Sequence, residues 1–406
     1  MVFKISAIVI IIVVSIFNLW VTYLKLQSVK NEIPDNVADI YNAEDYARWK
    51  EYRKEKVRLE IITEVITLAV NVILFALNVY ALFAGLFPKN TFMQLFAVIL
   101  FSTLTEIFVW PFDYYDTMKI EGKYGFNKTT EGAFFLDKVK EMILVLVLMT
   151  FITWLLSILH KSLGDYMIFV FAGVLILLIL TIVFLVPFFT RIFNKFTPLE
   201  EGELRTRLTE LLEKHGFRVR AIEVMDASKR STKANAYFAG FGKTKSIVLY
   251  DTILEKLTPE EICAVFAHEL GHGVHHDTTK GQFLMAFQMM LISVLAWLTL
   301  RFPEIFRGFG FEDVNYGFAV ILIMSVEFSL IAPLIGLVSN ALSRGHEYNA
   351  DKFAVNEGYG KALISGLKKI VHDDFGDVAP SRALIFLMYD HPSLSQRITA
   401  IEKLGR

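Results

Sequence analysis

Long apolar stretches separated by shorter polar segments dominate the chain. A helix needs about 20 mostly apolar residues to cross the roughly 30 Å hydrocarbon layer of a bilayer. The first such stretch exceeds the apolar core of a secretory signal and no small-x-small cleavage site follows it, so we expect a retained span. The stretches that meet the length requirement are 5–24, 61–87, 92–112, 142–160, 166–189, 283–300 and 318–340. The pattern therefore predicts seven transmembrane helices.

Basic residues in the loops predict how these helices are oriented, because short loops rich in Lys and Arg stay on the cytoplasmic side. Of the 41 basic residues, only five fall on one side of the seven spans. These five are Lys4, Lys89, Lys161, Arg301 and Arg307. We expect an integral multi-pass protein of a bacterial cell membrane or the endoplasmic reticulum. Its segments 190–282 and 341–406 then face the cytoplasm.

Composition agrees with a membrane protein and excludes other classes. The 406 residues are 54% hydrophobic and only 20% charged, with a net charge of -1. This balance argues against a soluble globule, a disordered chain or a nucleic-acid binder. One cysteine, Cys263, rules out an internal disulfide and a cysteine-rich metal site. Glu106 and Glu327 lie inside predicted spans, which indicates either an internal polar cavity or side chains that reach the interface.

The segment 190–282 reads as a soluble unit of mixed secondary structure. Helical periodicity covers 199–215, and alternating or apolar runs predict strands at 218–225 and 246–250. A further helix begins at Thr258, where Pro259 suits the first turn and Glu261 completes a capping box.

That helix carries the sequence His268-Glu269-Leu270-Gly271-His272, an HExxH motif. Residues four apart share a helix face, so both imidazoles can bind one zinc ion while Glu269 borders its open position. Zinc acidifies its bound water and polarises a carbonyl, and Glu269 would act as general base and later as acid. The pattern predicts peptide hydrolysis.

A catalytic zinc normally takes a third protein ligand. His275 and His276 are near enough in sequence to be considered. Glu347 is the stronger candidate, because Asp351 shares its helix face and would hydrogen-bond a ligand imidazole. The alternative for this segment is a solvated acidic helix face.

Several motifs together resemble those of the CAAX prenyl protease 1 family of integral-membrane zinc metalloproteases. They include the segment 120–128 with its Gly125-Phe126-Asn127-Lys128 end, Asn235-Ala236-Tyr237-Phe238 within 231–240, and the strand 247–252. HExxH, the Ser343-Arg344-x-x-Glu347-x-x-Ala350-Asp351 element, and His391-Pro392 followed by Arg397 complete the set. Their common order extends over nearly the whole chain.

The resemblance implies a mainly α membrane protein whose seven helices enclose a large water-filled chamber, with a cytoplasmic α+β zinc metalloprotease domain of the gluzincin type. It implies one zinc ion per chain on His268, His272 and Glu347, with Glu269 as catalytic base and acid. It also places Asn235 beside a strand that pairs with substrate, His391 at the oxyanion, and Arg397 on the acidic residues near the zinc. From the residues alone, Asn235 is equally a turn residue and His391 a residue at a helix start.

The predicted organisation has four parts: 1–189 with the first five spans, 190–282 with the HExxH helix, 283–340 with the last two spans, and 341–406, which completes the zinc site. We expect an endopeptidase that removes the C-terminal aaX tripeptide from farnesylated CaaX proteins. A quality-control metalloprotease of the heat-shock type is the alternative. A metal transporter or sensor is a remote one, because no His lies mid-span. The expected partners are a peptide or prenylated protein and the bilayer, with no nucleic acid, and we expect a monomer.

Overall fold

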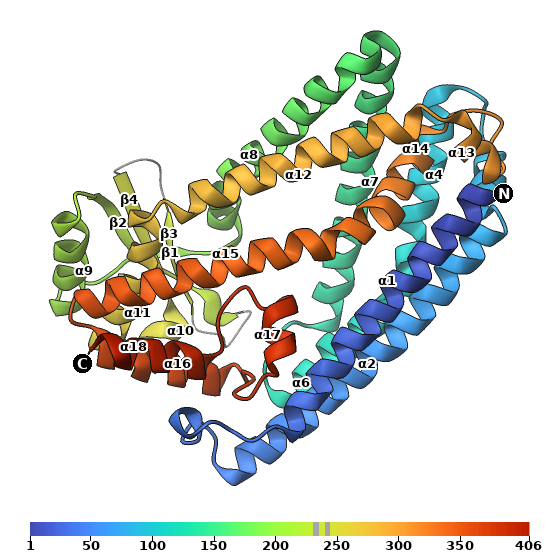
Figure 1. The fold of residues 1–406 in the computed structure, drawn as a ribbon. Helices are drawn as coiled ribbons and strands as arrows, with labels where there is room; N and C mark the ends of the chain where they lie inside the picture. The colour runs from blue at the N-terminus through green and yellow to red at the C-terminus, as the bar shows by residue number, and fades with distance from the viewer. Residues whose placement is uncertain (230–234, 240–243, 406) are drawn as a thin grey trace.

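The computed structural model describes residues 1–229, 235–239 and 244–405. Two long helices, α1 (Val2–Gln27) and α2 (Ala43–Ala76), pack side by side along one flank (Figure 1). α2 starts well before the predicted span because its polar first half is also helical. The helix ends before Asn78, whose left-handed φ of 56° separates it from α3 (Val79–Ala84).

The third predicted span is an α-helix only in its first part. α4 (Thr91–Thr105) is followed by a 3-10 turn at Glu106–Phe108, then α5 (Trp110–Tyr114), a π-helical segment (Tyr115–Glu121) and α6 (Gly122–Tyr124). Pro111 at the start of α5 has no N–H to donate to the preceding turn, which favours this change of helix type.

The remaining apolar stretches form α7 (Glu131–Leu163), α8 (Met167–Phe193), α12 (Asp277–Leu300), and a last helix composed of α14 (Tyr316–Leu322), a π-helical turn (Ile323–Glu327) and α15 (Phe328–Asn356). The short α13 (Pro303–Gly308) lies between α12 and α14. Among the described residues, six helical stretches are long and apolar enough to cross a bilayer. One of them, Glu131–Ile182, contains both α7 and part of α8, divided by a 3-10 turn at Gly164–Tyr166. Six stretches therefore replace the seven predicted spans, and the predicted spans 61–87 and 92–112 each extend past a break in the α-helix, at Asn78 and after Thr105.

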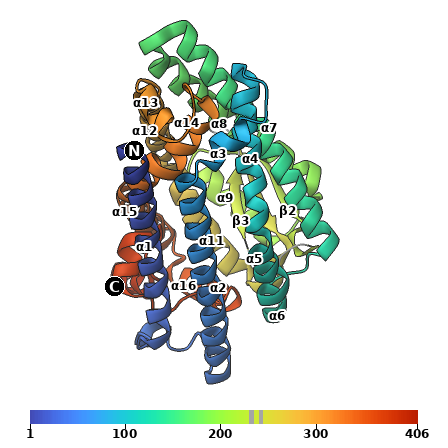
Figure 2. The same ribbon diagram turned by 90° about the vertical axis from the view of Figure 1, so that its right-hand side faces the viewer.

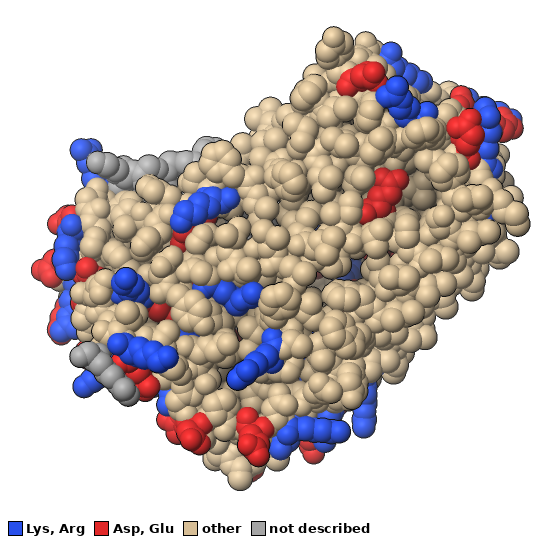
Figure 3. All heavy atoms as spheres, viewed as in Figure 1, with Lys and Arg blue, Asp and Glu red and all other residues tan. Residues whose placement is uncertain are grey.

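These helices enclose a chamber. The accessible surface is 21274 Å², whereas a compact protein of this mass exposes about 16,000 Å². An apolar cluster that includes Phe75, Leu95 and Phe318 fills the end near the N-terminus. Figure 3 shows an apolar belt between two charged ends, with an opening between α1 and α15 through which deeper side chains are visible.

The metalloprotease segment closes the other end. Its sheet has the order β1-β2-β4-β3, formed by β1 (Phe196–Pro198), β2 (Arg218–Met225), β4 (Thr244–Tyr250) and β3 (Ala236–Ala239). β2 and β4 are parallel, the other pairs are antiparallel, and β3 is an edge strand of the described sheet. The predicted mixed structure is confirmed. Of the motif at 231–240, residues 231–234 and 240 lie outside the described residues.

Three helices pack on this sheet: α9 (Glu203–Lys214), α10 (Asp251–Lys256) and α11 (Pro259–Val274). The remaining helices pack on α11 or α15 instead; they are α16 (Gly360–Asp373), α17 (Arg382–Met388) and α18 (Leu394–Leu404). α11 opens with the predicted capping box, in which Thr258 Oγ1 accepts from the Glu261 amide and Glu261 Oε2 accepts from the Thr258 amide. α11 packs on α15, the continuation of the last membrane helix, and this contact forms the site.

Candidate metal centre and active site

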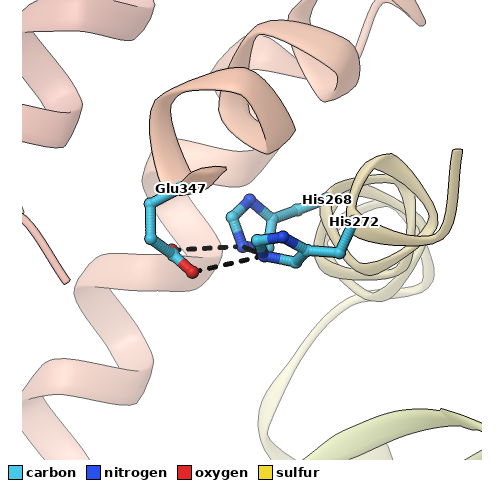
Figure 4. Close-up of side chains that lie close together, drawn as sticks. All are labelled: His268, His272 and Glu347. Carbon is cyan, nitrogen blue, oxygen red and sulfur yellow. Dashed lines mark hydrogen bonds and ion pairs between the residues drawn. The ribbon is translucent and has the colours of Figure 1, made fainter. Parts of the chain in front are cut away.

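Three side chains from two helices meet at one point. His268 and His272 extend from successive turns of α11 toward the Glu347 carboxylate on α15 (Figure 4). The Nε2 atoms of the two imidazoles are 3.3 Å apart. Glu347 Oε2 is 3.4 Å from His268 Nε2, and Glu347 Oε1 is 3.2 Å from His272 Nε2. In the described part of the chain, this trio is the group whose ligand atoms converge on one point.

The trio fits a tetrahedral metal. Ligands at about 2.0–2.1 Å from zinc stand about 3.3 Å from one another in a tetrahedron, which matches the separation of the two imidazole nitrogens. Each imidazole also has one Glu347 oxygen at a similar distance. Glu347 is 4% exposed, and its carboxylate stands between the two imidazoles and Arg397 Nη1, which favour its charged, metal-binding form. Three protein ligands leave the fourth position for water or substrate.

Close helix packing makes this convergence possible. A Cβ at Gly271, between the two histidines, would lie 3.0 Å from Ala350 Cα and 3.1 Å from Phe353 Cβ on α15. Gly271 therefore lets the α15 backbone approach α11. Without that approach Glu347 would stand too far from the imidazoles.

Asp351 and Arg397, both buried, form a chain of polar contacts that ends at Nδ1 of His268, the ring nitrogen that faces away from the trio. Asp351 Oδ1 lies 2.9 Å from His268 Nδ1, and Arg397 donates from Nε and Nη2 to the two Asp351 oxygens at 2.9 and 2.7 Å. Arg397 Nη1 is also 3.3 Å from Glu347 Oε2. Burial alone would lower the pKa of Arg397, but the bond to Asp351 outweighs it and the pKa is raised. Such a partner fixes the imidazole so that Nε2 faces the metal position.

His272 has a corresponding partner that the sequence pattern did not reveal. Asp277 Oδ2 lies 3.0 Å from His272 Nδ1, and Lys280 pairs with Asp277 Oδ1 at 2.8 Å. Burial alone would lower the pKa of His272, but hydrogen bonds with Glu347 and Asp277 raise it to about 9. A proton therefore competes with a metal for His272 through neutral pH, and metal binding releases it.

The remaining predicted residues line one cavity of about 320 Å³ with the trio. Glu269 is half-buried in its wall beside His268. His391 Nε2 lies 3.2 Å from Glu347 Oε1, and Asp390 Oδ1 lies 2.8 Å from His391 Nδ1. Asn235 precedes the edge strand β3, and its backbone oxygen accepts from the Tyr250 amide. The structure thus brings all the predicted site residues together.

The other candidate ligands lie elsewhere. His275 Nδ1 contacts the Gly271 carbonyl oxygen at 2.7 Å, and His276 has a left-handed φ of 57° at the start of α12. The acidic face of α15 is not solvated either, since Glu347 is 4% and Asp351 0% exposed. Glu347 is the third member of the group.

Family models match both halves of the chain. The model described as CAAX prenyl protease N-terminal, five membrane helices, matches residues 22–195, and the model of peptidase family M48 matches residues 198–405. The chain belongs to the CAAX prenyl protease branch of peptidase family M48. It is thus an integral multi-pass membrane metalloprotease, and its substrates are peptides or proteins.

Individual relatives of this M48 chain extend over nearly its full length. The CAAX prenyl protease 1 homolog of Oryza sativa subsp. japonica is 31% identical over 91% of this chain and 90% of its own. CAAX prenyl protease 1 of Saccharomyces cerevisiae is 28% identical over 95% and 92%. The crystal structure of S. mikatae Ste24p superposes with a TM-score of 0.87 at 27% identity, over 99% of each chain. The architecture of helical chamber and protease segment is therefore shared.

Arg344, from the same sequence motif as Glu347, connects α15 to the chain segment that precedes His391. Arg344 lies one turn before Glu347 on α15 and donates from Nη1 to the carbonyl oxygens of Ile385 and Tyr389 at 3.1 and 2.6 Å. Ile385 lies in the last turns of α17, and Tyr389 follows the end of that helix, two residues before His391. The helix α15, which carries Glu347, thereby also holds the segment that carries His391.

Proposed function

We propose that the chain is a zinc endopeptidase that removes the three residues following the prenylated cysteine of CaaX proteins. The observation that carries the proposal is the His268, His272 and Glu347 trio, with Glu269 and an edge strand beside it in one cavity. The His and carboxylate donor set is typical of catalytic zinc. The substrate class follows from the names of relatives that match along nearly the whole chain.

The proposed chemistry assigns one task to each side chain. Bound zinc supplies an acidified water and a polarised carbonyl. Glu269 accepts the proton of that water and delivers it to the leaving amine. His391, which lines the cavity with Nε2 3.2 Å from Glu347 Oε1, donates to the oxyanion of the tetrahedral intermediate. The edge of β3 that faces away from β4, to which no other described strand pairs, binds the extended substrate backbone, and Asn235 directly precedes that strand.

We further propose that this site faces the cytoplasm and that the chain acts as a monomer. Orientation is supported by the basic residues, all but five of which lie on the side of the metalloprotease segment. A complete set of proposed catalytic groups within one chain supports the monomer, because no second copy is needed to supply a residue.

The deciding experiment compares a farnesylated CaaX peptide with its unprenylated twin, using purified protein with and without a zinc chelator. We expect chelator-sensitive release of the aaX tripeptide, faster from the farnesylated peptide. Glu269→Gln should retain zinc by elemental analysis and lose several orders of magnitude in cleavage rate. Equal cleavage of both peptides would favour a quality-control protease, and substantial activity in Glu269→Gln would remove Glu269 from its assigned role.

A further inference from the structure

Two cavities flank the place where α2 passes α5. The first is a groove of about 440 Å³ between the two helices, within the range of about 300–1,000 Å³ that is usual for small-molecule sites. Its lining is mainly apolar, with two charged side chains on α2 among it. The residues that line it include Arg58, Leu59, Ile62, Pro111, Phe112 and Tyr115.

The second cavity, of about 390 Å³, lies between α1, α2 and the α5 segment and is polar. It is lined by ionisable and hydroxyl side chains that include Lys25, Lys56, Glu60, Thr63, Glu64 and Asp116. Leu59 and Phe112 line both cavities. These two half-buried side chains therefore form the partition between the apolar groove and the polar cavity.

The periodicity of α2 shows what each cavity faces. Ile62 lies on a helix stripe with Ile66 and Ile73, and these side chains are 50%, 39% and 53% exposed. An exposed isoleucine stripe on a membrane helix faces lipid. On the other face Glu64 accepts from Ser15 at 2.6 Å and Glu60 pairs with Lys25 at 2.8 Å. Glu64 lies inside the predicted span 61–87, and an ionisable group at that depth faces a watery interior, so this side of α2 faces the chamber.

We call the contact between α2 and the α5 segment the α2–α5 seam. Ion pairs and hydrogen bonds connect the two sides at one end of this seam but not at the partition. Below the partition, Lys56 pairs with Asp116 at 2.7 Å and with Glu121 at 2.9 Å, and the Tyr52 hydroxyl donates to Glu121 at 2.8 Å. At the partition itself, Leu59 and Phe112 have no polar side-chain atoms to bind each other. α5 is also short, carries Pro111 in its first turn and lies between a 3-10 turn and a π-helical segment, a combination that permits helix displacement.

We propose that the α2–α5 seam is the port through which the substrate enters from the bilayer, and that the apolar groove binds its isoprenoid chain. This inference rests on the proposed function and adds to it a binding site and an entry route. Displacement of Phe112 from Leu59 joins the groove to the chamber. The peptide then passes into the polar cavity while the isoprenoid chain stays on the lipid side. Figure 2 shows α2 and α5 side by side, in front of the metalloprotease segment with α11.

The groove suits an isoprenoid chain for a chemical reason. A branched hydrocarbon gains by leaving water for an apolar surface, and the groove offers such a surface at the depth where a prenylated cysteine is anchored. Arg58 and Tyr115 are residue types that concentrate at the membrane interface, and both are exposed here. The peptide, by contrast, needs the polar groups of the second cavity. One pair of sites thus separates the two chemical halves of a single substrate.

The first test fills the groove. Ile62→Trp should raise KM for the farnesylated peptide about tenfold with little change in kcat, because it removes binding made equally in ground and transition states. Cleavage of the unprenylated twin should lose less than cleavage of the farnesylated peptide, so the ratio of the two kcat/KM values should fall. Ile73→Trp is the matched control, since Ile73 is equally exposed on the same stripe but does not line the groove. Equal kinetics of Ile62→Trp and Ile73→Trp would overturn the proposal. Zinc content checks that each variant is folded.

The second test locates the chain directly. A CaaX peptide carrying a photoreactive isoprenoid should crosslink to residues 55–62 and 110–115 in the zinc-loaded Glu269→Gln protein, and farnesylated peptide should compete. Crosslinks elsewhere, or labelling by a photoreactive phospholipid that farnesylated peptide does not displace, would show a lipid-filled groove and overturn the proposal. If wild-type protein cleaves neither peptide, the proposed function itself fails, a result distinct from cleavage that ignores the groove variant.

Discussion

Each ligand imidazole is oriented by its own carboxylate. His268 contacts Asp351 and His272 contacts Asp277, at 2.9 and 3.0 Å. The first pair was predicted, because Asp351 lies one helical turn from Glu347 and so follows it on the same face. The second was not, because Asp277 is five positions after His272 and would leave its face on a continuous helix. The left-handed His276 breaks the helix and returns Asp277 to His272.

The partner of His272 can be tested by an isosteric change. Asp277→Asn keeps the shape but removes the charge that orients the imidazole, so zinc affinity should fall about 10–100-fold. Titration with a competing chelator measures this. Lys280→Gln is the control, because Lys280 contacts the other Asp277 oxygen and its ammonium is half-exposed. Equal zinc affinity in wild type and Asp277→Asn would contradict the orienting role.

The metal site depends on the packing of α11 against α15, because each helix supplies part of the ligand set. The HExxH spacing places two ligands on one face of α11, which a local rule predicts. The third ligand lies 75 positions beyond His272 and arrives only because two membrane helices intervene and return the chain. Its approach depends on Gly271, which no spacing rule identifies.

We expect Gly271→Ala to separate the two helices slightly. The added methyl group would stand 3.0 Å from Ala350 Cα, backbone that cannot move without shifting α15. Overpacking of this kind costs about 1–3 kcal/mol, so zinc affinity and cleavage rate should each fall roughly tenfold. Gly281→Ala on α12 meets nothing within 4 Å and serves as the control. Unchanged zinc affinity in Gly271→Ala would show that the packing tolerates a methyl group.

Arg344 allows a second test at this scale. Arg344→Gln removes the donor that fixes the end of α17, so His391 should lose its position while the ligands stay in place. We expect kcat to fall about 10–100-fold at unchanged zinc content. Amide hydrogen exchange at 385–391 should accelerate, and Arg344→Lys should restore part of the rate. Arg382→Gln, an exposed arginine on the same α17, is the control. Faster hydrogen exchange at 385–391 without a loss of kcat would show that the position of the α17 end does not affect catalysis, and would contradict the prediction.

The whole molecule is a helical chamber with charged ends, and its orientation sets which compartment supplies the peptide. We expect a cysteine at Lys161 to be labelled by an impermeant maleimide from the extracytoplasmic side, and one at Lys54 only after permeabilisation. Cys263 can remain in place, because it is 0% exposed and burial raises the pKa of its thiol to about 11. Labelling of position 161 from the cytoplasm alone would reverse the orientation.

The sequence by itself determined the features that depend on local rules. Apolar length gave the spans, helical periodicity gave the shared face of His268 and His272, and the order of motifs led to Glu347, Asn235, His391 and Arg397. Only the tertiary structure decided the features that depend on which helices meet. Asp277 reaches His272 because the chain turns at the left-handed His276, which no spacing rule predicts. The close approach at Gly271 and the Leu59 and Phe112 partition join separate helices, and the packing distance between helices is independent of their separation in the sequence.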